Sequence, residues 1–189
     1  MKKLLLSFVL SFIAICSFAQ DHLSFKGIPI EGTTTVFCQK LKDKGFTYIG
    51  RDGNVISLKG EFAGRQATIG VCGSDTGDNV YLVLVFFDTS DEWNTLVNTY
   101  DHYKKLYTSK YGEPILSQEK NPAISDYNRA KMLELHQGTV KYMSLWSLPG
   151  GDISLSIDNS SGHFEGRVTI GYVDSQNKKA EEQNVLDDI

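Results

Sequence analysis

The chain has 189 residues, of which 41% are hydrophobic and 22% charged, and its formal net charge is −4. This composition is that of an ordinary globular protein and excludes a disordered or low-complexity chain. The acidic balance argues against a nucleic acid or an anionic lipid as the partner, because both are bound by basic patches.

The first 19 residues predict a secretory signal peptide. Lys2 and Lys3 precede an apolar run from Leu4 to Phe18, and Ser17-Phe18-Ala19 is a small-x-small cleavage site. This run is shorter than the roughly 20 residues that span a bilayer, and no later segment is long and apolar enough to do so. We therefore expect cleavage after Ala19, export to the periplasm or the extracellular space, and no transmembrane segment in the mature chain.

Cleavage there leaves two of the three cysteines, Cys38 and Cys72. A lipoprotein would instead keep Cys16 at its new N-terminus, but the large Ile15 before it does not suit lipidation. An even number of cysteines in an oxidising compartment predicts a Cys38–Cys72 disulfide, and two buried free thiols are the alternative. Loss of the two signal lysines lowers the 19 basic residues to 17, against 23 acidic residues, for a net charge of −6.

Residues 20–174 are expected to form a single domain, followed by a polar tail at 175–189. An extended lead-in at 23–32 precedes a helix, which a threonine at 33 or 34 caps and Gly45 ends. Four strand-like runs follow the helix, at 46–50, 55–62, 66–72 and 80–87. The run at 80–87 is continuously apolar, which predicts a central strand buried on both faces.

A second helix is predicted at Asp91–Tyr111, with a capping box at Thr89–Glu92. From Asp174 the chain is polar and charged, so we expect a tail that docks a last helical turn or frays. Five further strand-like runs lie between the helix and this tail, at 115–118, 129–137, 139–147, 152–157 and 165–173.

The element order is a helix and a four-strand meander, followed by a helix and about five strands. Strands joined by short turns are mostly antiparallel, and helices between such meanders pack on one face of the sheet. The predicted fold is therefore α+β, with an antiparallel sheet of about eight strands and two main helices on one face. The two halves, 33–88 and 89–174, predict a tandem duplication of a helix-plus-meander unit.

Aromatic residues recur every three or four positions along the second predicted helix. One interpretation is a face that binds a ligand or partner. The spacing favours the other interpretation, a core stripe that lies on the sheet with its hydroxyl groups at the rim. The stripe consists of Trp93, Leu96, Tyr100, Tyr103, Tyr107 and Tyr111.

The sequence assigns no catalytic, cofactor-binding or metal-binding residue. It contains no G-x-S-x-G elbow and no glycine-rich phosphate cradle that opens a helix. The loop at 75–79 has oxygen side chains that suit calcium, but it lacks the glycine and glutamate positions of an EF-hand, which favours a plain hairpin loop. No histidine has a second ligand at a metal-binding spacing; the four are His22, His102, His136 and His163.

Seven short pieces of the chain carry a family resemblance: residues 18–20, 25–32, 41–46, 58–64, 110–114, 155–157 and 172–174. Together they resemble small secreted proteins of gut-type Bacteroidetes whose function is uncharacterised. Because these pieces are turns and core positions, the resemblance implies export and fold but no active-site residue. The element order is also similar to that of the β-lactamase-inhibitor-protein fold, and fold alone does not imply function.

The leading functional hypothesis is a secreted or periplasmic, non-enzymatic binding module of unknown ligand, with a protein as one kind of partner. The alternative is an accessory factor in envelope assembly or maintenance, and the third hypothesis is a hydrolase without a recognisable motif. A binding module predicts a contiguous exposed apolar or aromatic patch. An enzyme predicts a deep pocket in which groups with shifted pKa values converge.

Overall fold

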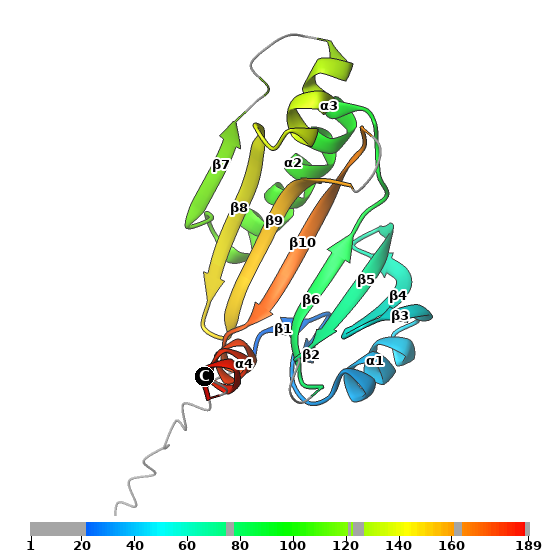
Figure 1. Cartoon of the computed structure of the whole chain (residues 1–189), viewed down its shortest axis with the longest axis vertical. Coiled ribbons are helices and arrows are strands. Elements are labelled where there is room, and N and C mark those ends of the chain that lie inside the picture. Colours follow the sequence, from blue (N-terminus) through cyan, green and yellow to red (C-terminus); the bar gives the residue numbers. More distant parts are fainter. Residues whose placement is uncertain (1–21, 75–77, 121, 123–126, 161–163, 188–189) are drawn as a thin grey trace, which may run out of the picture.

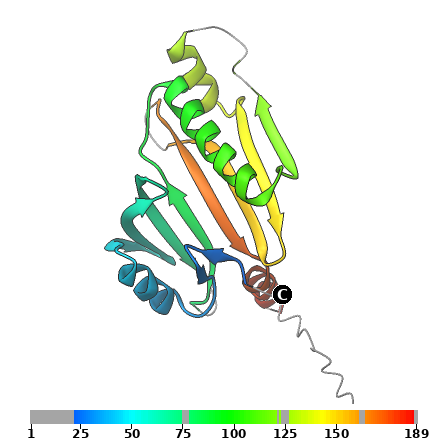
Figure 2. The ribbon, with the colours of Figure 1, turned by 180° about the vertical axis from the view of Figure 1, so that it is seen from behind.

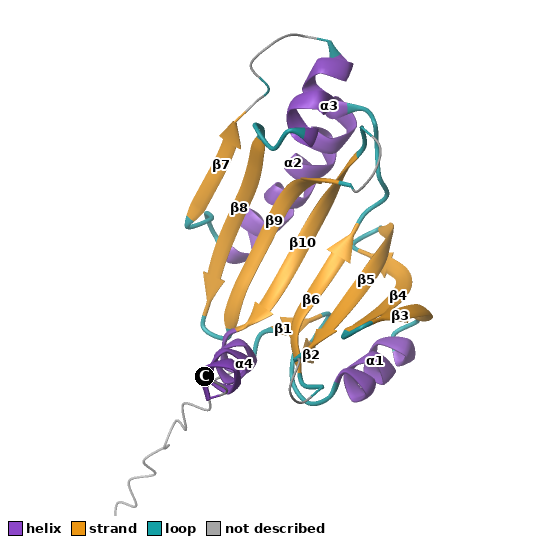
Figure 3. Ribbon diagram, viewed as in Figure 1, coloured by secondary structure: helices purple, strands orange, loops and turns teal. Residues whose placement is uncertain are grey.

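The computed structural model describes residues 22–74, 78–120, 122, 127–160 and 164–187. An eight-stranded antiparallel sheet, a two-stranded hairpin and four helices make up this part of the chain, which confirms the α+β class (Figures 1 and 3). None of these helices is long and apolar enough to cross a membrane. The elements are β1 (Ser24–Phe25), β2 (Ile28–Pro29), α1 (Thr34–Asp43), β3 (Thr47–Asp52), β4 (Val55–Phe62), β5 (Arg65–Gly73), β6 (Val80–Phe86), α2 (Trp93–Tyr111), β7 (Leu116–Lys120), α3 (Asn128–His136), β8 (Lys141–Leu148), β9 (Gly151–Asn159), β10 (Gly166–Asp174) and α4 (Ser175–Asp187).

Two four-stranded meanders meet at the centre of the large sheet, whose order is β3-β4-β5-β6-β10-β9-β8-β7. Each meander follows a helix, α1 or α2, and runs from one edge to the centre, where β6 and β10 pair antiparallel. The second meander also contains α3, between β7 and β8. This order is the one that two copies of a helix-plus-meander unit would give, while the duplication itself stays a prediction.

A single hydrophobic core joins alternate residues of the strands to the helices. Ile69, Val85, Ile170 and Leu155 form one register row across four neighbouring strands, and all four are fully buried. Burying each such side chain contributes about 1.5–3 kcal/mol. In this core α1 contacts β4 and β5, and α2 lies across β9 and β10, as Figure 2 shows.

Strand β6 differs from the prediction that it is buried on both faces. Val83 and Val85 face the core and are fully buried, but Leu84 between them points to the opposite face and is only half-buried. The neighbours of Leu84 on β5 and β10 are Gly70 and Gly171. Neither glycine has a side chain that could cover Leu84. The continuously apolar sequence of β6 therefore does not produce a strand that is buried on both faces.

The predicted strand at 129–137 is instead helix α3. Its buried apolar residues, Met132 and Leu135, are three positions apart, which is the spacing of a helix face. Asn128 at its start joins α3 to the start of α2, because its side-chain amide donates to the Asp91 carbonyl oxygen at 2.7 Å. The helix is therefore fixed by a tertiary contact.

The predicted polar tail begins with helix α4, which follows β10 without a loop. Asp174, the last residue of β10, is fully buried, and its Oδ1 accepts hydrogen bonds from the backbone N–H groups of Gln176 and Asn177. The side chain of Asn177 in turn donates to the carbonyl oxygens of Ile30 and Val80. These contacts hold the first turn of α4 against the end of the sheet.

Helices α1 and α2, which precede the two meanders, begin in different ways. Helix α1 starts as predicted, because the Thr33 hydroxyl accepts a hydrogen bond from the Val36 N–H at 3.3 Å, and Gly45 follows its end with φ +93°. The capping box predicted for α2 does not form. Helix α2 begins at Trp93, whose N–H donates to Asn128 Oδ1 at 2.8 Å, so a residue of α3 caps α2.

Candidate functional site

The structure contains no Cys38–Cys72 disulfide; both residues are free, buried thiols. Cys38 on α1 belongs to the hydrophobic core together with Val71 of β5. Successive side chains of a strand point to opposite faces, so Cys72 points away from the face that Val71 shares with Cys38. The two thiols therefore lie on opposite sides of β5, where no disulfide can join them without a change in the fold.

We expect both thiols to be unreactive in the folded protein and free in the unfolded one. Burial raises the pKa of Cys38 and of Cys72 to about 11, so the reactive thiolate is scarce at neutral pH. Iodoacetamide should add no carboxamidomethyl group to native residues 20–189, which contain only these two cysteines, and two groups in urea without reductant, as read by intact mass. A protein that gains them only after reduction would contradict the free-thiol arrangement.

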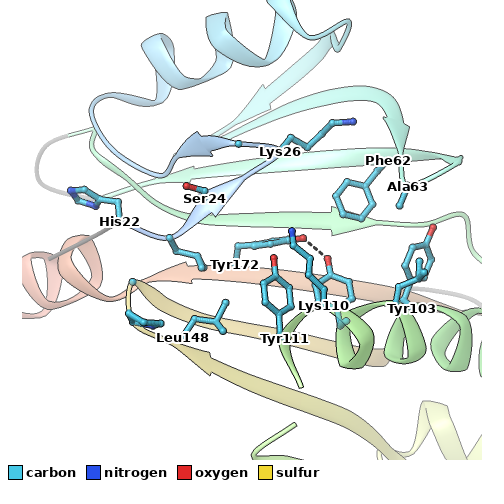
Figure 4. Close-up of a pocket in the computed structure, with 16 residues that line it drawn as sticks. His22, Ser24, Lys26, Phe62, Ala63, Tyr103, Lys110, Tyr111, Leu148 and Tyr172 are labelled. Atoms are coloured by element: carbon cyan, nitrogen blue, oxygen red, sulfur yellow. Dashed lines mark hydrogen bonds between the residues drawn. The ribbon is translucent and has the colours of Figure 1, made fainter. Parts of the chain in front are cut away.

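A cleft of about 620 Å³ lies between the C-terminal half of α2 and the N-terminal segment of the described chain (Figure 4). One wall is a single face of α2, because its residues lie at positions i, i+3, i+4, i+7 and i+8 of the helix. This wall continues the aromatic stripe that the sequence predicted as core, so the stripe is both core and cleft lining. The α2 wall of the cleft consists of Tyr103, Leu106, Tyr107, Lys110 and Tyr111.

The opposite wall is assembled from segments far apart in the sequence. It comprises residues 22–24 and 26–27 of the N-terminal hairpin, Phe62 and Ala63 at the β4–β5 turn, residues 148–150 of the β8–β9 turn, and Tyr172. Asp174 fixes the first of these segments, since its Oδ2 accepts a hydrogen bond from the Leu23 N–H at 2.8 Å. The aromatic ring of Phe25 stacks on Phe62 at 5.6 Å between centroids and holds the hairpin against the sheet.

One hydroxyl group at the cleft has no hydrogen-bond partner among the described residues. Tyr103 is fully buried, and its hydroxyl group is unpaired. One turn earlier on α2, Tyr100 is equally buried, but its hydroxyl pairs with Ser144 Oγ at 2.6 Å. An unpaired buried hydroxyl costs about 1–3 kcal/mol, so Tyr103 holds a donor that a ligand could satisfy.

Two further tyrosine hydroxyls meet at the floor of the cleft. Tyr107 on α2 and Tyr172 on β10 are hydrogen-bonded to each other, drawn as a dashed line in Figure 4. Burial raises the pKa of Tyr107, and the neighbouring Tyr172 raises it further. Burial also raises the pKa of Tyr172 and of Tyr103. All three phenols therefore stay protonated at neutral pH and can act as donors.

The charged residues of the lining are all basic. Lys26 and Lys110 line the cleft together with His22, and no aspartate or glutamate is among its described lining residues. Lys26 Nζ donates to the Glu61 carbonyl oxygen at 3.0 Å. Lys110 Nζ lies 4.8 Å from the centroid of the Tyr111 ring. The cleft thus combines aromatic walls with an electropositive lining in a protein of net negative charge.

No family model, curated protein or solved structure matched this chain. The properties of the cleft are therefore argued from its geometry. Its volume lies within the range of about 300–1,000 Å³ that small-molecule sites occupy. Its lining is mainly apolar with a few polar groups, which is also typical of such sites.

The cleft has few of the features that catalysis requires. His22 Nδ1 lies 3.1 Å from Asp174 Oδ2 without the geometry of a hydrogen bond. Ser24 lines the cleft near this pair, but among the described residues no hydrogen bond joins it to His22. The pKa values of Tyr103, Tyr107 and Tyr172 are raised away from neutrality, so these phenols stay protonated and are not available as general bases at neutral pH. Among the described lining residues, Ser24 and His22 are therefore not paired as a nucleophile and its base.

The histidines named from the sequence do not come together. His22 is at the cleft, His102 is exposed on α2, and His136 on α3 contacts the Asn159 amide at 3.2 Å. His163 and residues 75–77 of the acidic loop lie outside the described residues. Within the described ranges, no group of three or more histidine, cysteine, aspartate or glutamate side chains is placed to hold a metal ion.

A second, more open apolar surface lies at the α3 end of the molecule. Tyr127, Leu133 and Phe164 are 79%, 40% and 47% exposed and line a depression of about 430 Å³. No buried polar group without a partner faces this surface in the described part of the chain. The tyrosine cleft is therefore the stronger candidate, because it offers both enclosure and an unused donor.

Proposed function

We propose that this chain is an exported, non-enzymatic binding module whose ligand enters the tyrosine cleft with an apolar body. The observation that carries the proposal is the Tyr103 hydroxyl, a buried donor without a partner at the wall of a cleft of ligand size. A fold keeps such a group at a cost in stability, and a bound acceptor would recover that cost. The apolar walls would supply most of the remaining affinity.

Prodan, a neutral naphthalene dye with one carbonyl acceptor, is a suitable probe. The folded protein should increase the fluorescence of prodan and shift its emission to the blue. Leu106→Trp should abolish this, because Leu106 is 43% exposed and lines the cleft, so a larger ring there fills it. Val36→Trp is the matched control, at a 51% exposed helical position remote from the cleft lining, and should bind prodan as wild type does.

Two tyrosine variants separate binding from stability. Tyr103→Phe should weaken prodan binding on the order of fivefold, while the free energy of unfolding stays equal or rises by up to about 1 kcal/mol, since no native hydrogen bond is lost. Tyr100→Phe should keep the affinity for prodan but lose about 1–2 kcal/mol of stability, because it leaves the buried Ser144 hydroxyl unpaired. Absence of prodan binding to wild type, or equal binding by Leu106→Trp, would overturn the proposed function.

A further inference from the structure

The cleft offers hydrogen-bond donors that nothing in the described chain uses. Tyr107 and Tyr172 have two hydroxyl protons between them and share one hydrogen bond, so one of these protons is left for an acceptor. The Tyr103 hydroxyl provides a second unused donor. Tyr103, Tyr107 and Tyr172 all line the cleft, and no carboxylate is among its described lining residues. The polar groups of the site are therefore complementary to a ligand that accepts hydrogen bonds.

The two lysines of the cleft are not neutralised within the described chain. Neither Lys26 nor Lys110 forms a salt bridge with a described residue, whereas Lys104, on α2 like Lys110, pairs with Glu119. Figure 4 shows the Lys110 side chain extending from α2 toward the middle of the cleft, and Lys26 lying above Phe62. A negatively charged group beside these ammonium groups would gain attraction without first displacing a carboxylate.

We infer that the ligand of this cleft is an amphiphilic monoanion, an apolar body that ends in one carboxylate group. The apolar body fits the walls formed by Phe62, Leu106 and the tyrosine rings. The carboxylate accepts hydrogen bonds from the tyrosine hydroxyls and lies within the field of Lys26 and Lys110. This inference rests on the proposed function, because it names the ligand class of the same cleft.

Three probes that share a ten-carbon chain test the charge of the ligand: decanoate, decanol and decyltrimethylammonium. Each competes with prodan for the wild-type protein. Decanoate should displace prodan at a concentration about tenfold lower than the cationic probe, with decanol between the two. The advantage of decanoate should shrink between about 0.01 M and about 1 M salt, as the Debye length falls from about 30 Å to about 3 Å.

Lysine variants locate the source of the preference. Lys110→Gln and Lys26→Gln should each weaken decanoate binding about three- to tenfold and leave binding of the neutral prodan unchanged. Lys105→Gln is the matched control, because Lys105 is exposed on α2 and is not part of the cleft lining. It should change neither affinity.

The outcomes separate this inference from the proposed function. If wild type binds no prodan, the proposed function fails and this inference with it. If prodan binds but decanoate and decyltrimethylammonium compete equally well, the cleft is a binding site and the anionic ligand class is wrong. Equal losses of decanoate affinity in Lys105→Gln and Lys110→Gln would likewise overturn the assignment of the carboxylate to the cleft lysines.

Discussion

Replacing Asp174 with alanine is expected to lower the free energy of unfolding by about 3 kcal/mol, which is a large share of the 5–15 kcal/mol of a typical domain. The Asp174 carboxylate is fully buried and accepts three backbone hydrogen bonds. Two come from Gln176 and Asn177 at 3.1 and 2.9 Å and cap helix α4, and the third comes from Leu23 at 2.8 Å. Alanine leaves all three N–H groups without this acceptor.

The asparagine variant separates the two roles of Asp174. Asparagine keeps one oxygen, which can still cap α4, but it turns an amide NH₂ toward the Leu23 N–H, so two donors face each other. Asp174→Asn should therefore retain helix α4 while releasing the segment at 22–24. The loss in free energy of prodan binding should exceed the loss in free energy of unfolding. Urea unfolding at constant m-value measures the stability of both variants.

An exposed carboxylate provides the control for Asp174. Asp43 on α1 accepts a hydrogen bond from the Gln39 side chain at 3.0 Å but is open to solvent. Asp43→Ala should change the free energy of unfolding by less than about 0.5 kcal/mol. If Asp174→Ala were no more destabilising than this control, the buried carboxylate would not be the clamp that the geometry describes.

The sheet was predictable from the sequence because its signals are local. Alternating apolar residues and short glycine turns identified the strands at 55–62, 66–72 and 152–157 within a few residues of the observed β4, β5 and β9. The strand order followed from the short connections, since consecutive strands joined by tight turns pair with each other. The central β6–β10 pairing was not predicted, because no short turn connects these two strands.

The elements that the sequence missed depend on distant contacts. Helix α3 has nine residues, a short segment in which helical and strand periodicity are hard to separate. The Asn128 side chain ties it to the start of α2 through Asp91 and Trp93, some 35 residues earlier in the chain. The same contact replaces the local capping box that the sequence predicted for α2. A local pattern can indicate a local cap, but it contains no information about a cap from another helix.

One wall of the candidate site could be predicted from the sequence and the other could not. The tyrosine stripe of α2 was apparent, and its spacing favoured a core role, which Tyr100 and Tyr103 fulfil as fully buried residues. The signal for a second role was Lys110, a cation on the stripe side of the helix beside Tyr111. The opposite wall could not be predicted from the sequence, because it is formed by the N-terminal segment, the β4–β5 turn and the β8–β9 turn. Only the folded sheet brings these segments together.

Gly151→Ala is expected to cost about 3 kcal/mol or more in stability and to weaken prodan binding as well. Gly151 has φ +154°, and a Cβ atom built there would lie 2.0 Å from the Val173 carbonyl oxygen and 3.2 Å from Asp174 Cα. These are backbone atoms of the paired strand β10, so no side-chain rotation can relieve the clash. The β8–β9 turn must move instead, and residues 148–150 of that turn line the cleft.

Gly50→Ala is the control for this substitution, because Gly50 on β3 has no atom within 4 Å of a built Cβ. Its stability should stay within about 0.5 kcal/mol of wild type, as measured by urea unfolding, and its prodan affinity should not change. Equal stability of the two glycine variants would contradict the close approach of β9 to β10. Because Gly151 and Asp174 face each other in that strand pair, we expect the double variant Gly151→Ala/Asp174→Ala to lose less stability than the sum of the single losses. The first substitution already displaces the strand end that the carboxylate of Asp174 would hold.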